Sequence, residues 1–122
     1  MAKRILIIED NKYILEAVKI ILSNKGYEIM QSLGADEALH ILKDTKPDMI
    51  IMDLMMPGIS GIDLFKMLKK DKETRNIPII ILTAKTDAQK YYPELKRAED
   101  FIPKPFDKND LIKRVEKVLE DK

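Results

Sequence analysis

Three short apolar runs constrain the fold more than any other feature of this sequence. Each holds four apolar residues, rich in isoleucine, and ends at polar side chains: "ILIIED" (Ile5–Asp10), "MIIMD" (Met49–Asp53) and "IIILT" (Ile79–Thr83). Runs of this length are typical of strands that are buried on both faces, as in a parallel sheet. The more alternating "YEIMQS" (Tyr27–Ser32) predicts a half-exposed edge strand, and "DFI" (Asp100–Ile102) predicts a short fifth strand.

Helical patterns separate these runs. Apolar residues recur at spacings of three and four in segments that begin near Asn11, Asp36, Ile62 and Asp107, and we expect Asn11 and Asp107 to be amino-terminal caps. A fourth helix is expected before the last strand, but Pro93 lies in its middle, so it either begins near Pro93 or is kinked or partly unwound there. The alternation predicts an α/β fold, a doubly wound parallel sheet with helices on both faces.

Composition narrows the function classes. The 122 residues suit one domain, residues 1–122. Because 22 basic residues face 21 acidic ones, no global field favours nucleic acid, and we expect no direct nucleic-acid binding. The absence of cysteine excludes a disulfide scaffold and a cysteine nucleophile. The apolar run in "MAKRILIIED" is too short for a signal peptide or a membrane span, so we expect a cytoplasmic protein without membrane insertion.

Polar side chains gather where the predicted strands end, which is where ligands bind in open α/β sheets. Glu9, Asp10, Asp53 and Thr83 occupy such positions. If the first and third strands are neighbours, three carboxylates converge, and either a proton or a cation must offset their repulsion. Mg²⁺, which binds carboxylate, water and phosphate oxygens, is the natural cation. With the site neutralised, Asp53 becomes a nucleophile able to form an aspartyl phosphate.

The segment "FIPKPF" supplies a fixed cation. Lys104 lies between Pro103 and Pro105, which remove two backbone donors and restrict the residues before them to extended geometry. We expect this tether to aim the ammonium at the crowded carboxylates. A cis Lys104–Pro105 bond is compatible with the sequence, because an X–Pro bond costs only about 0.5–1 kcal/mol in the cis form.

Taken together, these motifs resemble the receiver domain of two-component response regulators. They are the acidic pair Glu9–Asp10, "MDLMMPGISG" around Asp53, "ILTAK" around Thr83 and "FIPKPF" around Lys104, and their order and spacing match over nearly the whole chain. The resemblance, to single-domain chemotaxis regulators above all, implies a flavodoxin-like (βα)5 fold with a five-stranded parallel sheet in the order 2-1-3-4-5. It implies that a sensor histidine kinase or a histidine phosphotransfer protein phosphorylates Asp53.

The resemblance also implies a set of groups for the metal and the phosphoryl group. Mg²⁺ would be held by the carboxylates of Asp10 and Asp53, by Glu9 through water, and by the backbone carbonyl of Met55. The phosphoryl oxygens would be held by the side chains of Thr83 and Lys104 and by the backbone N–H groups of Leu54 and Ala84. Thr83 and Phe101 would form a switch, in which the hydroxyl turns to the phosphate and the ring fills the vacated space.

The implied output is binding of a downstream protein target at the surface of the fourth helix, fifth strand and last helix. The chain would not be an enzyme beyond phosphorylating itself from a phosphodonor and dephosphorylating itself. Because it ends soon after the last helix, we expect a single-domain member without an output domain, although the same sequence fits one domain of a longer protein. Met55 and Lys85 lie where the family tunes its hydrolysis rate.

Two other functions are compatible with parts of the pattern. A degenerate receiver, used only as a docking module, would explain "RAED" (Arg97–Asp100) where the family often has Gly-Ala-Asp, and would explain Pro93. A phosphatase of the haloacid dehalogenase type also uses a strand-end aspartate, but it needs a second acid two residues later, where Met55 cannot act as a general acid.

Several residues have plain structural interpretations. Glu9 and Asp10 are alternatively caps of the first helix, and Phe101 is alternatively an ordinary core residue. Pro57 and Gly58 predict a turn in which the glycine has a positive φ, and Gly61 is interpreted as part of the same loop. His40 is interpreted as exposed and inert. Among the surface charges, one lysine group alternates with acids and is interpreted as a solvated helix face: Lys66, Lys69, Lys70 and Lys72.

Overall fold

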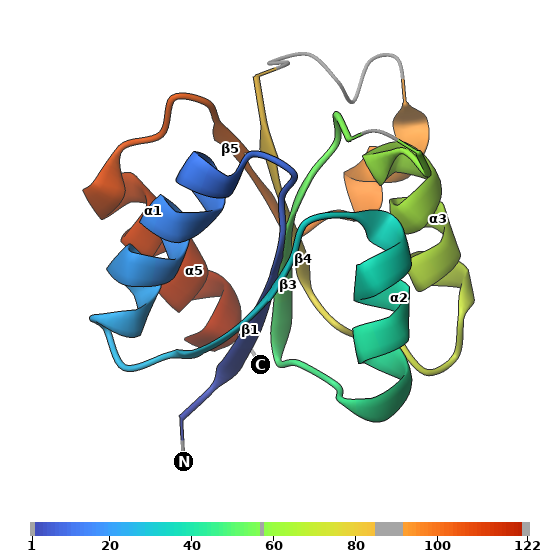
Figure 1. Ribbon diagram of the computed structural model, residues 1–122, viewed down its shortest axis with the longest axis horizontal. Helices are drawn as coiled ribbons and strands as arrows, with labels where there is room; N and C mark the ends of the chain where they lie inside the picture. The colour runs from blue at the N-terminus through green and yellow to red at the C-terminus, as the bar shows by residue number, and fades with distance from the viewer. Residues whose placement is uncertain (1, 57, 85–91, 121–122) are drawn as a thin grey trace.

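Five strands form one parallel sheet in the computed structural model, which describes residues 2–56, 58–84 and 92–120. They are β1 (Arg4–Ile8), β2 (Glu28–Ser32), β3 (Met49–Asp53), β4 (Ile79–Thr83) and β5 (Asp100–Pro103). Their order across the sheet is β2-β1-β3-β4-β5 (Figure 1). The expected order is therefore confirmed, and β1 and β3 are neighbours.

The apolar runs are buried on both faces of this sheet, as their composition predicts. Every residue of β3 and β4 is buried, whereas β2 lies at an edge and is only partly buried. Within β1, Ile5 and Ile7 belong to one core cluster, and Leu6 and Ile8 belong to the other. Burial of one such side chain contributes about 1.5–3 kcal/mol, so the two clusters account for much of the driving force for folding.

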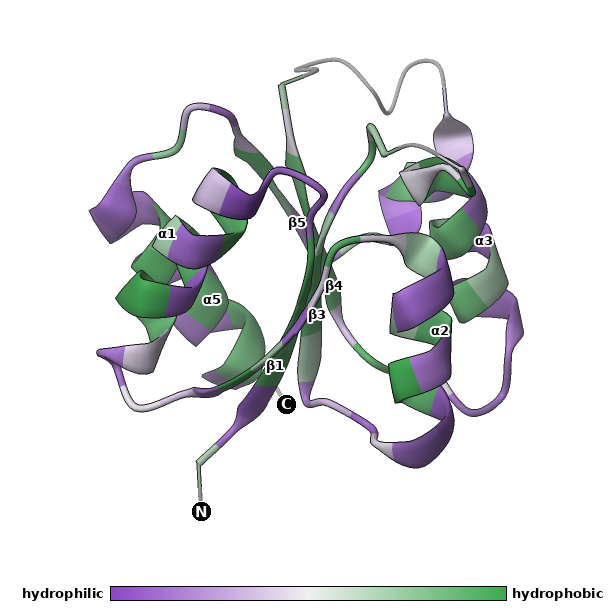
Figure 2. Ribbon diagram, viewed as in Figure 1, coloured by the Kyte–Doolittle hydropathy of each residue, from purple (hydrophilic) through white to green (hydrophobic). Residues whose placement is uncertain are grey.

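Helices cover each face of the sheet (Figure 1). Helices α1 (Lys12–Ser23) and α5 (Lys108–Glu120) lie on one face, and α2 (Ala35–Asp44), α3 (Gly61–Lys70) and the 3-10 helix η1 (Pro93–Arg97) lie on the other. Figure 2 shows the central strands in the hydrophobic colour, while the helices show both colours. No helix in the described ranges is both long enough and apolar enough to cross a membrane.

The expected helix caps are confirmed. The Asn11 side chain accepts hydrogen bonds from the backbone N–H groups of Tyr13 (2.9 Å) and Ile14 (3.2 Å). Asp107 accepts one from the backbone N–H of Asp110 at 2.9 Å. Asn11 is therefore the cap residue of α1, and Glu9 adds only a hydrogen bond from the backbone N–H of Asn11 itself, at 3.1 Å.

Among the described residues that precede β5, a helix begins at Pro93, which agrees with one of the two alternatives for this segment. It is a five-residue 3-10 helix, and its Leu95 is completely buried against the sheet. Proline suits the first turn of a helix, where its missing N–H has no partner to lose. Pro57 and Lys85 lie outside the described residues, whereas Gly58 has the expected positive φ of 76° and His40 is exposed.

Lys69 contradicts the interpretation of the α3 lysines as a solvated face. Only 6% of Lys69 is exposed, because it follows the buried Phe65 by four residues and so lies on the inner side of α3. Its ammonium donates to the backbone carbonyls of Ile77 (3.1 Å) and Arg75 (3.3 Å), and it lies 3.9 Å from the Glu99 carboxylate. A buried lysine is tolerated when its charge is paired in this way.

Candidate metal centre at the carboxyl ends of the strands

The pairing of β1 with β3 brings three acidic side chains together. Ile8 is paired with Met52, so Glu9 and Asp53 come next on adjacent strands. Oxygen atoms of Glu9, Asp10 and Asp53 all lie within 4.8 Å of one another. Glu9 and Asp53 are only 1% and 3% exposed, whereas Asp10 is exposed. The expected convergence of carboxylates is confirmed.

Lys104 reaches this cluster from the loop after β5. Its Nζ lies 2.8 Å from Glu9 Oε1 and 3.2 Å from Asp53 Oδ2. Its backbone N–H donates to the carbonyl of Thr83 at 2.9 Å, which joins this loop to the end of β4. The Lys104–Pro105 bond is cis. The tethered ammonium therefore points at the carboxylates, as the flanking prolines predicted.

The ionised cluster carries more negative than positive charge, which favours binding of a cation. Burial raises the pKa of Glu9 to about 7, although hydrogen bonds from Lys104 and from the backbone of Asn11 oppose this rise. Burial alone would lower the pKa of Lys104, but the hydrogen bond to Glu9 and the charges of Asp53 and Glu9 outweigh it and raise that pKa. With all groups ionised, three carboxylates face one ammonium, an excess of two negative charges. One divalent cation would balance that excess.

The ligand chemistry of the cluster fits Mg²⁺. Carboxylate oxygens are the hard ligands that this ion prefers. Glu9 Oε2 accepts a hydrogen bond from the backbone N–H of Asn11 at 3.1 Å. Glu9 Oε1 is buried and faces the Lys104 ammonium at 2.8 Å, and no other donor of the described residues reaches it. A metal-bound water would be a second donor to this oxygen.

The remaining predicted residues surround the cluster. Asp53 is paired with Leu82, so Thr83, which is 2% exposed, follows directly on the neighbouring strand. The backbone N–H of Met55 donates to Asp53 Oδ1 at 3.2 Å, while the Met55 side chain is exposed. Leu54 is buried, and Ala84 is exposed at the end of β4.

Phe101 has the core contacts of one of its two interpretations. It is half-buried and packs against the core cluster that includes α3 and Leu95. Its backbone N–H donates to Asp100, and its carbonyl accepts from Arg114 at 3.0 Å. Core packing is therefore observed, and the switch role of Phe101 stays a prediction.

Gly61 is a site residue that sequence reasoning placed only in a turn. A Cβ at this position would lie 2.3 Å from the carbonyl oxygen of Asp53 and 2.5 Å from Leu54 Cα. Its N–H also donates to the Leu54 carbonyl at 3.0 Å. The first residue of α3 is thus packed directly against the backbone that follows β3, and no side chain fits between them. The glycine at the start of the helix in "PGISG" was the available signal.

Comparison of the sequence with known proteins identifies the family that it matches. The family model described as "Response regulator receiver domain" matches residues 5–116. The phosphate regulon transcriptional regulatory protein PhoB of Pseudomonas aeruginosa is 40% identical over 120 residues, which are 98% of this chain and 52% of that protein. The chain spans about half the length of the curated relatives it matches.

Solved structures show the same architecture. The response regulator TrrA of Thermotoga maritima, in complex with Mg²⁺-BeF, has a TM-score of 0.84 and 33% identity, and the match covers 94% of this chain and 97% of that one. The chemotaxis response regulator CheY4 of Vibrio cholerae has a TM-score of 0.89 and 28% identity, with 97% and 99% covered.

Proposed function

Because the chain belongs to the response regulator receiver domain family, and so to two-component signalling, we propose that it accepts a phosphoryl group on Asp53 in a magnesium-dependent reaction. The observation that supports this proposal most strongly is the meeting of Glu9, Asp10, Asp53 and Lys104 at one edge of the sheet. The Mg²⁺-BeF complex of the related TrrA is consistent with it.

The reaction transfers a phosphoryl group to the Asp53 carboxylate from a phosphohistidine or from a small donor such as acetyl phosphate. A carboxylate oxygen of Asp53 attacks phosphorus, the O–P bond forms as the bond to the donor breaks, and the donor keeps the electron pair of that bond. Mg²⁺, held by Asp10, Asp53 and the Met55 carbonyl and by Glu9 through water, would supply positive charge beside the transferred oxygens. Attack of water on phosphorus would later break the bond between Asp53 and phosphorus, release inorganic phosphate and return the free carboxylate. The chain would have no other enzymatic activity.

The protein groups around Asp53 would bind the transferred phosphoryl group. The Lys104 ammonium already lies 3.2 Å from Asp53 Oδ2 and is fixed by its backbone bond to Thr83, so little reorganisation is needed when negative charge arrives. The Thr83 hydroxyl and the backbone N–H groups of Leu54 and Ala84 would donate to the phosphoryl oxygens. Movement of the Thr83 hydroxyl would be linked to the position of Phe101.

The partners follow from this chemistry. A sensor histidine kinase or a histidine phosphotransfer protein would supply the phosphoryl group, and a downstream protein target would read the surface of η1, β5 and α5. Arg114 lies on that surface, 2.7 Å from Asp100 and 2.9 Å from Asp110, so it already ties β5 to α5. A change at Phe101, whose carbonyl binds Arg114, would be transmitted directly to these ion pairs.

Intact-mass spectrometry after incubation with acetyl phosphate and Mg²⁺ tests the proposal. We expect a gain of one phosphoryl group that disappears in EDTA and in Asp53→Asn. The control Asp44→Asn, which changes an exposed acid of α2, should be phosphorylated normally. A gain that persists in Asp53→Asn would contradict the assignment of the acceptor. If no magnesium-dependent gain occurs, the degenerate receiver that serves only as a docking module is the better description.

A further inference from the structure

A basic groove lies between α3 and η1, and none of its lining residues belongs to the acidic cluster. It has a volume of about 240 Å³ and is lined by Phe65, Lys66, Lys69, Lys70, Glu94 and Arg97. Four of these six side chains are basic and one is acidic, although the whole chain has a formal net charge of only +1. This local excess of positive charge, on walls that include an aromatic ring, favours an anionic ligand.

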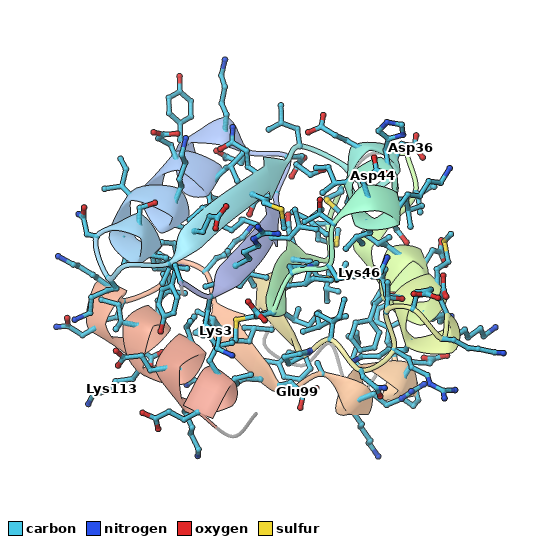
Figure 3. All side chains as sticks on the ribbon, turned by 90° about the horizontal axis from the view of Figure 1, so that it is seen from below. Lys3, Asp36, Asp44, Lys46, Glu99 and Lys113 are labelled. Carbon is cyan, nitrogen blue, oxygen red and sulfur yellow. The ribbon has the colours of Figure 1, made fainter. Side chains whose placement is uncertain are left out.

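Two carboxylates of the chain already pair with lysines that line the groove. Glu94 Oε2 of η1 lies 3.4 Å from Lys66 Nζ of α3, so this ion pair crosses the groove. The carboxylate of Glu99, which is labelled in Figure 3, lies 3.9 Å from the ammonium of the buried Lys69. The Lys66–Glu94 pair is exposed at both side chains, and such pairs are weak, so an external carboxylate can replace Glu94.

Two cations of the groove have no carboxylate partner. In the part of the chain that the structure describes, neither Lys70 nor Arg97 has a carboxylate within ion-pair distance, and both residues are exposed. One amino group of the Arg97 guanidinium donates to the backbone carbonyl of Lys69 at 3.3 Å, which anchors the side chain beside α3. The planar donors of an anchored guanidinium suit a carboxylate.

Helix α3, which forms one wall of the groove, disfavours binding of a compact dianion such as a phosphate group. Lys69 and Lys70 belong to the last turn of α3, where the backbone presents carbonyl oxygens and the negative end of the helix dipole. A phosphate group binds best where backbone N–H groups converge, as at a helix amino terminus. Single carboxylates spread along a peptide need only one cation each, which matches basic side chains that come from two separate elements.

We propose that the groove between α3 and η1 binds an acidic segment of a partner protein, with carboxylates of that segment replacing Glu94 at Lys66 and pairing with Lys70 and Arg97. This site is separate from the proposed phosphorylation of Asp53 and does not depend on it. It gives the chain a second binding surface, on the side of η1 that faces α3 rather than on the side that continues to β5 and α5.

Fluorescence anisotropy with a fluorescein-labelled octaglutamate peptide, titrated with the full chain at low salt, tests this proposal. We expect saturable binding that Lys70→Ala/Arg97→Ala weakens by about tenfold, since two charge-assisted contacts are lost. The matched control Lys12→Ala/Lys113→Ala removes the same charge from exposed positions of α1 and α5, on the other face of the sheet, and should change affinity little. The Lys70 side chain makes no hydrogen bond in the described structure, so the single variant Lys70→Ala should stay folded. Weaker peptide binding by this variant would therefore reflect the lost contact and not unfolding.

A variant of Glu94 distinguishes binding in the groove from attraction to the net positive charge of the chain. Glu94→Gln should tighten binding by about threefold, because it removes the carboxylate that competes for Lys66. Glu16→Gln on α1 raises the net charge equally and should not tighten binding. The proposal is overturned if the peptide does not bind, if the two glutamate variants behave alike, or if the control lysine pair weakens binding as much as the groove pair. Displacement of the peptide by inorganic phosphate, but not by free glutamate at equal ionic strength, would also overturn it, since the groove would then be a phosphate site.

Discussion

Replacing Glu9 by glutamine should change how the stability of the metal-free protein depends on pH. The pKa of Glu9 rises from its ordinary value of 4.5 to about 7 in the folded chain, mainly because the carboxyl is buried. Since the folded pKa is the higher one, the folded state binds more protons than the unfolded state between these values. The stabilisation is therefore fully present below pH 4.5 and is lost as pH rises through about 7.

The magnitude follows from the size of this interval. At about 1.4 kcal/mol for each pH unit, the interval from 4.5 to about 7 corresponds to roughly 3 kcal/mol. Most of it, roughly 2–3 kcal/mol, falls between about pH 5 and pH 8. Glutamine has nearly the same shape and cannot ionise, so Glu9→Gln lacks this term. The unfolding free energy of the wild type should fall by that amount relative to Glu9→Gln over this range.

Urea unfolding of both proteins in EDTA, at about pH 5 and pH 8, measures this difference. Glu16→Gln, which changes an exposed glutamate of α1, is the matched control and should follow the wild type. At the higher pH, saturating Mg²⁺ should raise the unfolding free energy of the wild type by more than that of Glu9→Gln. If the unfolding free energies of wild type and Glu9→Gln change in parallel with pH, the carboxyl is not a buried group with a raised pKa, and the electrostatic reasoning about the cluster is wrong.

Three further predictions concern residues that support the site or the fold. Gly61→Ala should destabilise the protein by about 1–3 kcal/mol and weaken Mg²⁺ binding, because the added methyl group overlaps the backbone after β3. The control Gly34→Ala, whose new Cβ meets nothing within 4 Å, should leave Mg²⁺ affinity unchanged. Thermal unfolding measures the change in stability, and titration calorimetry measures the change in Mg²⁺ affinity. Lys104→Ala should tighten Mg²⁺ binding, since the carboxylates lose their ammonium, yet slow phosphorylation by acetyl phosphate; equal weakening of both would contradict the assigned role. Lys69→Met should lower the free energy of unfolding in urea by about 1–3 kcal/mol, because the backbone carbonyls of Arg75 and Ile77 lose the ammonium that donates to them. An unchanged free energy of unfolding would show that this buried lysine is dispensable.

The sheet could be predicted from the sequence because its strands are buried on both faces. That environment excludes polar residues, so β1, β3 and β4 read as unbroken apolar runs. The strand order is different, because nothing in the runs themselves says which strands are neighbours, and it came from the resemblance. The form of the fourth helix was not decided either, since Pro93 is compatible with a helix start and with a kink.

The acidic cluster was predictable because strand ends meet at one edge of a parallel sheet, and Lys104 was predictable because its two prolines fix it. Gly61 was missed because its role depends on the close approach of two segments, which spacing along the chain does not reveal. Lys69 was missed for a different reason. Its charge suggested solvent, although its four-residue spacing from Phe65 placed it on the inner side of α3.

A crystal structure of the protein with Mg²⁺ and beryllium fluoride would show whether Asp53 accepts a phosphoryl group at this metal site. We expect the ion to be bound by Asp10, Asp53 and the Met55 carbonyl. Beryllium should be bonded to the Asp53 carboxylate, with fluorides in contact with Lys104 and Thr83. Beryllium fluoride bound elsewhere, or an ion-free cluster in which Lys104 alone still pairs with Asp53 at saturating Mg²⁺, would contradict it.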